Sequence, residues 1–379
     1  MKHILLVDDN ITSLKQAAAL LRDAYKVTMV KSGQQALEFL EKYTPHLILL
    51  DIEMPDMDGF ETIQRIKLDE RFRKIPVIFL TGNHDTATET KGFECGAADF
   101  ITKPYSQEVM LHRISLQIQL ASYQNRLETE KERMTAELDV ATKIQASMLP
   151  QHFEIFEKKG LFSVYANMEP AREVGGDFYD CFQVDDDHMA VVIADVSGKG
   201  VPAALFMVIA KTLIKTKAKG ILSPGRVLEE VNREIYDTNE EDMFVTLFLG
   251  ILELSTGKFV CANAGHNPPI HLHKDGRAEY FSIKQNFILG VMPGMTFEEN
   301  VVQLEENDKI FLYTDGITEA IDEKNEFYGE ERLLAQLQNP QVAGMSVKTL
   351  LDYVKEQLNF FTGNTEQEDD ITMLAFQYR

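Results

Sequence analysis

The sequence lacks an excess of positive charge and any long apolar run, and each shortage narrows the possible classes of protein. Among 379 residues, 38 Lys and Arg stand against 60 Asp and Glu, which gives a formal net charge of −22. Nucleic-acid binding depends on Lys and Arg that displace phosphate counterions, so this balance argues against a general nucleic-acid partner. The apolar content of 44% and the charged content of 26% are ordinary for globular proteins and exclude a wholly disordered or fibrous chain.

Cysteine is also scarce, and its placement excludes two kinds of site. Cys95, Cys181 and Cys261 lie far apart, without metal-ligand or redox spacing, and we expect buried thiols in a reducing cytosol. The longest apolar run, residues 201–210, contains a proline and is too short to span a bilayer. The first residues lead into a strand-like segment without the features of a secretory leader. We therefore expect a cytoplasmic protein with no membrane partner.

Strand-like and helical segments alternate over the first 120 residues. The apolar strand segments are 2–7, 26–30, 46–50, 76–80 and 99–102, and helical patterns occupy 11–24, 33–43, 59–69 and 85–95. Near-continuous apolar strands separated by helices indicate a parallel sheet that is covered on both faces. We predict a flavodoxin-like α/β domain with a five-stranded parallel sheet, over residues 1–120.

Residues 106–150 form the second region, which overlaps the last helix of the first domain. Residues 106–148 contain neither Gly nor Pro, and apolar residues recur largely at the 3-4 spacing of a coiled coil: Leu116, Leu120, Tyr123, Leu127, Met134, Leu138, Ala141 and Met148. Glu130 interrupts this seam, and the step from Met134 to Leu138 shifts it as a stutter would. We predict a helical linker that pairs with its copy in a homodimer. A single amphipathic helix that packs on one domain is the alternative.

Residues 151–379 form the third region, in which the pattern changes to short alternating strands. This region carries 20 basic and 38 acidic residues, a net charge of −18. Strand-like segments lie at 161–168, 177–184, 188–194, 244–253, 257–263, 268–273, 309–314 and 371–377, and helical ones at 202–219, 224–238, 330–337 and 346–360. We predict an α+β domain with two packed antiparallel sheets flanked by helices.

Five chemically active residues follow or end strands of the first domain: Asp8, Asp9, Asp51, Thr81 and Lys103. Ligands of an open parallel sheet bind at the carboxyl ends of its strands, so these residues are expected to meet at one rim. Three carboxylates together favour a bound cation, and a lysine with a hydroxyl suits a phosphoryl group. A carboxylate can itself be phosphorylated to an acyl phosphate.

The runs VDD (7–9), DIEMPDMDG (51–59), LTG (80–82) and GAADFITKP (96–104) resemble the receiver domain of bacterial response regulators. The resemblance implies that Asp51 is the phospho-acceptor, and that Asp8, Asp9, Asp51 and the backbone carbonyl of Glu53 hold Mg²⁺. It also implies switch roles for Thr81, Phe100 and Lys103, and a cis Lys103–Pro104 bond. Gly82 replaces the alanine that is usual in the family. A pseudo-receiver, which cannot be phosphorylated, is disfavoured because each position that the phosphorylation chemistry needs carries a suitable residue.

A second set of carboxylates lies at strand ends in the third region: Asp177, Asp195, Asp315 and the pair Asp369 and Asp370. Three of these ends are flanked by glycine, which permits close backbone approach. Oxygen-rich clusters suit Mg²⁺ or Mn²⁺, and two such ions activate a water for phosphoryl displacement. No phosphate-binding P-loop motif is present. His266 has no second His or Cys at ligand spacing, and a structural role at its turn is expected.

The runs VGGDFYD (174–180), DVSGKGVPAAL (195–205), NAGHNPP (263–269), LYTDGITEA (312–320) and EDDITML (368–374) resemble PPM-type serine/threonine phosphatases. They are most similar to the bacterial stress-response and sporulation (stage II E-like) members. The resemblance implies two Mn²⁺ or Mg²⁺ ions held by Asp177, Asp195, the Val196 carbonyl, Asp315 and Asp369, with Asp370 as the alternate to Asp369. No general acid is assigned. Arg172 is a candidate phosphate contact, with an ordinary surface arginine as the alternative.

Together the two halves predict a two-component response regulator whose output is a metal-dependent protein serine/threonine phosphatase. A sensor histidine kinase would phosphorylate Asp51 and thereby control the activity, and the implied substrate is a phosphorylated anti-sigma-factor antagonist. The alternative is a catalytically silent, phosphorylation-dependent binding or scaffold protein in a partner-switching pathway. A DNA-binding regulator is disfavoured because no basic helix-turn-helix follows the receiver-like region.

Overall fold

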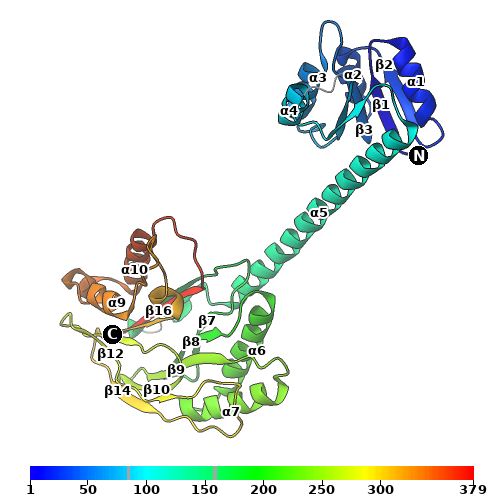
Figure 1. Cartoon of the computed structure of the whole chain (residues 1–379). Coiled ribbons are helices and arrows are strands. Elements are labelled where there is room, and N and C mark those ends of the chain that lie inside the picture. The colour runs from blue at the N-terminus through cyan, green and yellow to red at the C-terminus, as the bar shows by residue number, and fades with distance from the viewer. Residues whose placement is uncertain (83–85, 157–159) are drawn as a thin grey trace. The chain divides into compact units, whose positions relative to one another are not determined.

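The computed structural model describes residues 1–82, 86–156 and 160–379, and it divides into two compact units. The first unit is Met1–Thr135 and the second is Ala136–Arg379, so the division falls within one long helix. Each unit is described by itself below, and both are drawn in Figure 1. Residue 85, where one helix was expected to begin, lies outside the described residues. No helix in the described ranges combines the length and apolar character needed to cross a membrane.

The first unit contains a five-stranded, all-parallel sheet in the order β2-β1-β3-β4-β5. Its strands are β1 (His3–Val7), β2 (Lys26–Val30), β3 (Leu47–Asp51), β4 (Val77–Thr81) and β5 (Asp99–Thr102). Its helices are α1 (Ile11–Leu21), α2 (Gly33–Leu40), α3 (Gly59–Leu68), α4 (Thr86–Glu94) and the first part of α5 (Gln107–Met148). The predicted flavodoxin-like arrangement is confirmed.

Two separate apolar clusters, one on each face, explain why the strands are apolar throughout. Leu5, Val7 and Phe79 belong to one cluster, whereas Ile4 and Leu6 belong to the other. Because side chains alternate across a sheet, a strand covered on both faces must be apolar at every position. This packing fixes the carboxyl ends of β1, β3, β4 and β5 at one edge, which is where the predicted polar residues lie.

Helix α5 contributes to the first unit only through its beginning. Met110, Ile114 and Ile118 are buried against the sheet, at the 3-4 spacing of one helix face. Six residues of the predicted seam have exposed side chains on α5: Leu116, Leu120, Tyr123, Leu127, Met134 and Met148. The other two, Leu138 and Ala141, are partly buried, and the pairing of this helix with a second copy stays a prediction.

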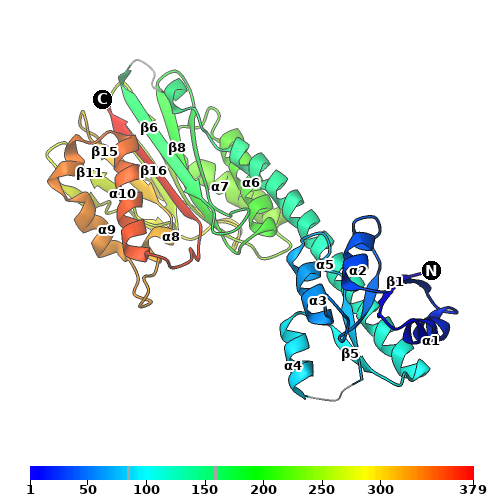
Figure 2. The ribbon, with the colours of Figure 1, turned by 90° about the horizontal axis from the view of Figure 1, so that it is seen from above.

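The second unit is a four-layered α/β/β/α sandwich, seen edge-on in Figure 2. The first sheet has the order β13-β10-β9-β8-β7, with β14 also paired to β10; the second has the order β12-β11-β15-β16-β6. The strands of the first sheet are β7 (Phe178–Gln183), β8 (His188–Val196), β9 (Val245–Glu253), β10 (Lys258–Ala264), β13 (Gln285–Asn286) and β14 (Asn300–Gln303). Those of the second sheet are β6 (Phe162–Glu169), β11 (Ile270–Leu272), β12 (Ala278–Tyr280), β15 (Lys309–Tyr313) and β16 (Ile371–Tyr378).

Helices cover both outer faces of this sandwich. Helices α6 (Val201–Lys217) and α7 (Pro224–Thr238) pack on the first sheet, and α10 (Val347–Thr362) packs on the second, with α9 (Glu330–Leu337) against its β12 edge. The short helix α8 (Asp315–Thr318) follows β15, and 3₁₀ turns occupy Phe153–Phe156 and Pro340–Gly344. Strand β15 shows the layering directly, because Ile310 and Leu312 face the core between the sheets while Phe311 and Tyr313 face the core under α9 and α10.

Candidate functional sites in the two units

Four predicted residues of the first unit meet at the carboxyl edge of its sheet. The Nζ atom of Lys103 lies 2.8 Å from Oδ2 of Asp8 and 2.9 Å from Oδ1 of Asp51. Asp8, Asp9 and Asp51 each place one carboxylate oxygen within 4.8 Å of those of the other two. Asp8 and Asp51 are buried and Asp9 is exposed, so the cluster opens to solvent on one side.

The surroundings at this edge raise the pKa of both Lys103 and Asp51. The charged form of Lys103 is therefore favoured, and the charged form of Asp51 is disfavoured. Burial raises the pKa of Asp51, and the neighbouring Asp8 and Asp9 raise it further, although Lys103 opposes this shift. Burial lowers the pKa of Lys103, but its hydrogen bonds to Asp8 and Asp51 outweigh burial and raise it overall. A divalent cation among the three carboxylates would relieve the repulsion that Asp51 experiences.

The predicted switch residues surround the same edge. Thr81 is buried at the end of β4, and its carbonyl accepts a 2.8 Å hydrogen bond from the backbone N–H of Lys103. The buried ring of Phe100 packs against Phe79 and Phe93, with ring centroids 5.6 Å and 4.9 Å apart. The Lys103–Pro104 bond is cis, as expected. Glu53 has an exposed side chain, and the role of its carbonyl stays a prediction.

In the second unit, Asp177 lies at the centre of a fixed set of hydrogen bonds. Asp177 is buried, and its Oδ2 atom accepts a 2.7 Å hydrogen bond from the hydroxyl of Thr314. The same hydroxyl accepts a bond from the backbone N–H of Thr372, which joins β15, β16 and the segment before β7. Burial raises the pKa of Asp177 well above its ordinary range, and repulsion from Asp195 adds to this shift.

Three further predicted carboxylates lie close enough to repel one another. Burial raises the pKa of Asp195 to about 7, and Asp315 and Asp369 contribute to the rise. Burial raises the pKa of Asp315 to about 6, and Glu319 and Asp369 contribute. Crowded carboxylates at a partly buried position are costly unless a cation neutralises them. The structure thus brings together carboxylates that are separated by up to 192 residues in the sequence.

Asp369 and Asp370, which the sequence left as alternates, play different parts in the structure. The carboxylate of Asp370 accepts backbone N–H groups from Ala171 (2.8 Å), Gly176 (2.7 Å) and Asp177 (3.4 Å), so it anchors the loop before β7. The carboxylate of Asp369 instead pairs with Nζ of Lys199 at 2.9 Å and repels Asp195 and Asp315. This division favours Asp369 as the cation ligand.

Two glycines allow this close packing. A Cβ atom at Gly176 would lie 2.8 Å from the carbonyl oxygen of Val196, which places that carbonyl beside the Asp177 loop. A Cβ atom at Gly316 would lie 2.0 Å from the carbonyl oxygen of Asp370. Any larger residue at either position would push the carboxylate-bearing segments apart.

Known families match both units. The family described as "Stage II sporulation protein E (SpoIIE)" matches residues 185–379. The chain belongs to this family. The family described as "Response regulator receiver domain" matches residues 4–115. The chain therefore combines an N-terminal receiver domain with a C-terminal SpoIIE/PP2C-type phosphatase domain, and both resemblances drawn from the motifs are confirmed.

Curated relatives share parts of this chain. Protein IcfG of Synechocystis is 32% identical over 279 residues, which cover 66% of this chain and 41% of that protein. The phosphoserine phosphatase RsbU of Bacillus subtilis is 28% identical over 189 residues, which cover 50% of this chain and 55% of that protein. The chain thus spans about half, or less, of the length of these relatives.

Solved structures support the fold of the SpoIIE-family domain. The PP2C domain of SiaA from Pseudomonas aeruginosa matches with a TM-score of 0.58 at 21% identity, and covers 66% of this chain and 99% of that one. The RsbU and RsbW domains of Rv1364c from Mycobacterium tuberculosis match with a TM-score of 0.50 at 27% identity, covering 58% of this chain and 60% of that one.

Three contributors to the SpoIIE-family site were missed in the sequence: Lys199, Gln145 and Thr314. Lys199 lies in the SGKG run and pairs with Asp369. Gln145 hydrogen-bonds the loop before Asp177, and Thr314 bonds Asp177 itself. Lys199 and Thr314 lie in the runs DVSGKGVPAAL and LYTDGITEA that carry the family resemblance, but neither residue was given a role from the sequence. Arg172 is exposed in the bend at 171–174, and the described residues show no ion pair that ties it to the carboxylates.

The histidines of this domain include His266, whose partner Thr246 stands opposite Asp195 in the pairing of β8 with β9, and a second group farther along the chain. His266 is buried, its Nδ1 atom lies 2.9 Å from the Thr246 hydroxyl, and burial lowers its pKa to about 4, which agrees with the expected structural role. His271, His273 and Asp308 form a second group with candidate ligand atoms within 4.8 Å. Asp308 precedes β15 whereas Asp315 follows it, so this group lies at the opposite end of the strand.

Proposed function

We propose that the chain is a two-component response regulator whose output is a metal-dependent phosphatase for phosphoserine or phosphothreonine in a protein. The observation that carries this proposal is a row of neighbouring carboxylates that repel one another. Asp195 repels Asp177, and Asp195, Asp315 and Asp369 repel one another. We assign the receiver to residues 1–120, the helical linker to 106–150 and the phosphatase domain to 151–379.

The carboxylate set fits Mg²⁺ or Mn²⁺, because it offers hard oxygen donors whose repulsion a cation would remove. Asp177 and Asp195 would hold both ions of a pair, with the Val196 carbonyl as a further ligand and Asp315 and Asp369 on the far side. Bound ions would supply a water of lowered pKa and neutralise phosphoryl oxygens. The chain keeps Asp177 oriented through the Thr314 hydroxyl. Arg172 remains a proposed phosphate contact from the edge of this site.

The receiver edge supports control by phosphorylation of Asp51. Asp8 and Asp9 would hold Mg²⁺ together with Asp51 and the Glu53 carbonyl, while Thr81 and Lys103 would contact the phosphoryl oxygens. Phe100 would change its position when Asp51 is phosphorylated, and this would alter the surface of the receiver around it. A sensor histidine kinase is the proposed phosphodonor.

Helix α5 is the proposed route from the receiver to the phosphatase domain. Its exposed apolar seam favours pairing with a second copy of the chain. Its last turns contact the loop that carries Asp177 through Gln145. A change in pairing would therefore act on the carboxylate site through this contact, and we propose that it would also reposition the helices of segment 202–238.

The proposed substrate is a phosphorylated anti-sigma-factor antagonist, which the family resemblance implies. The name of the relative RsbU, a phosphoserine phosphatase, supports phosphoserine as the residue that is hydrolysed. The alternative is a catalytically silent scaffold that binds partners in a phosphorylation-dependent manner. The crowded carboxylate set speaks against it, because a silent site has no need for buried charge that destabilises the fold.

Phosphate release from a phosphoserine protein in Mn²⁺ tests the proposal. We would compare the full chain, Asp195→Asn and the exposed control Asp186→Asn, each with and without beryllofluoride. We expect release from the full chain and the control, none from Asp195→Asn, and a rate that changes with beryllofluoride. No release under any condition would favour the scaffold alternative, and release indifferent to beryllofluoride would refute receiver control.

A further inference from the structure

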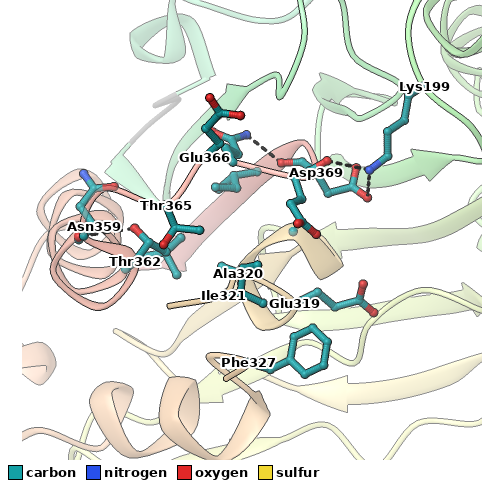
Figure 3. Close-up of a pocket in the computed structure, with 16 residues that line it drawn as sticks. Lys199, Glu319, Ala320, Ile321, Phe327, Asn359, Thr362, Thr365, Glu366 and Asp369 are labelled. Atoms are coloured by element: carbon teal, nitrogen blue, oxygen red, sulfur yellow. Dashed lines mark hydrogen bonds and ion pairs between the residues drawn. The ribbon is translucent and has the colours of Figure 1, made fainter. Parts of the chain in front are cut away.

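A cavity of about 420 Å³ adjoins the carboxylate site on the side of Asp369. Figure 3 shows its lining, which comes from the end of α8 and the residues after it, the last turn of α10, and the loop from residue 363 to the start of β16. Gly316 and Asp369 belong both to this lining and to the carboxylate site. The cavity therefore adjoins the place where a phosphoryl group would be hydrolysed, and its volume falls in the range of ligand sites.

Part of the cavity lining is apolar, and its exposure to water is unfavourable. Phe327, Ile321 and Leu358 contribute to its lining. Phe327 is 64% exposed, although burial of a phenylalanine side chain is favourable. The segment that carries it is held in place by a bridge between Ile321 and Phe327 and by the backbone bonds that close the turn at Asp322. An exposed aromatic on a fixed turn beside a reaction site is suited to hold an apolar side chain of a partner.

The cavity also has an acidic part. Glu319, Glu366 and Glu368 line it, and Lys199 is the one cation among the lining residues that the structure describes. That lysine pairs with Asp369 and donates a hydrogen bond to the Glu368 carbonyl, so the lining keeps an excess of negative charge. A phosphoryl group alone would be repelled here. A cationic side chain would be attracted.

We propose that this cavity binds the substrate segment beside the phosphorylated residue, and that it selects a segment with one apolar and one basic side chain. The apolar side chain would pack on Phe327, and the Lys or Arg would face Glu366 and Glu368. This proposal rests on the phosphatase function proposed above and adds its substrate preference. The occupant is a peptide segment because the cavity adjoins Asp369 and combines both kinds of lining.

The test compares a small substrate with peptides on the full-length protein in Mn²⁺. p-Nitrophenyl phosphate reports the metal site alone, since it has no flanking residues. A phosphoserine peptide library, varied at the four positions on either side, reports the cavity. Phe327→Ala is the test variant, and Phe360→Ala is its control, because Phe360 is 89% exposed on α10 and does not line the cavity. Both rings are exposed, so neither change should disturb folding.

For the charge, Glu366→Gln is the test variant and the exposed Glu356→Gln on α10 is its control. We expect the full chain to prefer peptides that carry a basic and an apolar residue. Phe327→Ala should lower kcat/KM for those peptides about tenfold, and Glu366→Gln should lower it several-fold at low salt and less at high salt. Both variants should hydrolyse p-nitrophenyl phosphate normally, and both controls should match the full chain.

The outcomes separate the two proposals. The cavity assignment would be overturned if Phe327→Ala and Glu366→Gln had the same kcat/KM as the full chain for every peptide and hydrolysed p-nitrophenyl phosphate normally. The phosphatase proposal would then still hold. Equal losses in test and control variants would also overturn the cavity assignment. Failure of the full chain to hydrolyse p-nitrophenyl phosphate would overturn the phosphatase proposal, and the cavity assignment with it.

Discussion

Gln145, in the last turns of α5, exchanges two hydrogen bonds with the backbone of Gly175, two residues before Asp177. Its Nε2 atom donates to the Gly175 carbonyl at 2.6 Å, and the Gly175 N–H donates to its Oε1 atom at 3.1 Å. Both residues are buried. The end of the long helix and the loop that carries Asp177 are therefore joined by a two-point contact, so a rotation or shift of α5 must either move this loop or break both bonds.

Replacement of Gln145 by Leu should lower phosphatase activity by about 10- to 100-fold and raise the Mn²⁺ concentration needed for half-maximal rate. The loss of two buried hydrogen bonds would also cost about 1–3 kcal/mol of folding stability, because the Gly175 backbone groups lose their partners. Phosphate release against Mn²⁺ concentration, together with thermal unfolding, measures both effects.

The matched control for this change is Gln151→Leu, since Gln151 is exposed and makes a single hydrogen bond to the Ala146 carbonyl. Equal metal dependence in the two variants would show that the contact with Gly175 does not position Asp177.

Sequence periodicity predicted the receiver well and the SpoIIE-family domain less completely, for physical reasons. Continuously apolar strands such as β3 and amphipathic helices such as α7 carry strong local patterns. Strands β12, β13 and β14 have only two to four residues, which is too short for alternation to be visible, and they exist because β10, β11 and their neighbours offer pairing edges. These three strands therefore depend on tertiary contacts, and no local sequence pattern predicts them.

The candidate sites follow the same rule. The positions of Asp8, Asp51 and Lys103 could be predicted because parallel topology brings strand ends together. The different roles of Asp369 and Asp370 could not be predicted. They depend on which of the two carboxylates accepts hydrogen bonds from the N–H groups of a loop about 200 residues earlier in the chain. Gln145 was hidden for the same reason, since a glutamine in a helix carries no local signal.

Replacement of Asp51 by Asn should abolish phosphoryl incorporation from a small phosphodonor such as acetyl phosphate and remove any response of phosphatase activity to beryllofluoride. The basal activity should remain, because Asp51 belongs to the receiver unit. The control is Asp56→Asn, at an exposed residue with φ of 67°, a conformation that Asn adopts readily. Intact-protein mass measures incorporation; a phosphoryl group on Asp51→Asn would mean that another residue accepts it.

Replacement of Leu127 by Glu should convert a dimer of the full chain to monomers. Leu127 is 47% exposed on α5 and lies on the predicted seam with Leu120 and Tyr123, so pairing would bury it and a carboxylate there would be desolvated. Asn125→Glu places the same charge off the seam and should leave the dimer intact. Light scattering after gel filtration gives the mass of each. A wild-type monomer at micromolar concentration would contradict pairing through α5.

Replacement of Asp195 by Asn should change activity and metal-free stability in opposite directions. Burial and the charges of Asp315 and Asp369 raise the pKa of Asp195 to about 7, above its value of 3.8 in the unfolded chain. Between these values the folded state binds more protons than the unfolded state, so the metal-free protein loses stability as pH rises from about 4 to about 7. The variant removes this loss.

In chelator at pH 8 we expect Asp195→Asn to unfold at a higher temperature than the full chain, by an amount that corresponds to about 2 kcal/mol. At pH 5 the difference should be smaller, because Asp195 is then still protonated in the folded chain and only part of the loss between about pH 4 and about pH 7 has occurred. With Mn²⁺ added, only the full chain should be stabilised, and only it should hydrolyse phosphoserine. Calorimetry at both pH values measures this; a variant that is less stable than the full chain at pH 8 without metal would mean that Asp195 is not under the repulsion the structure indicates.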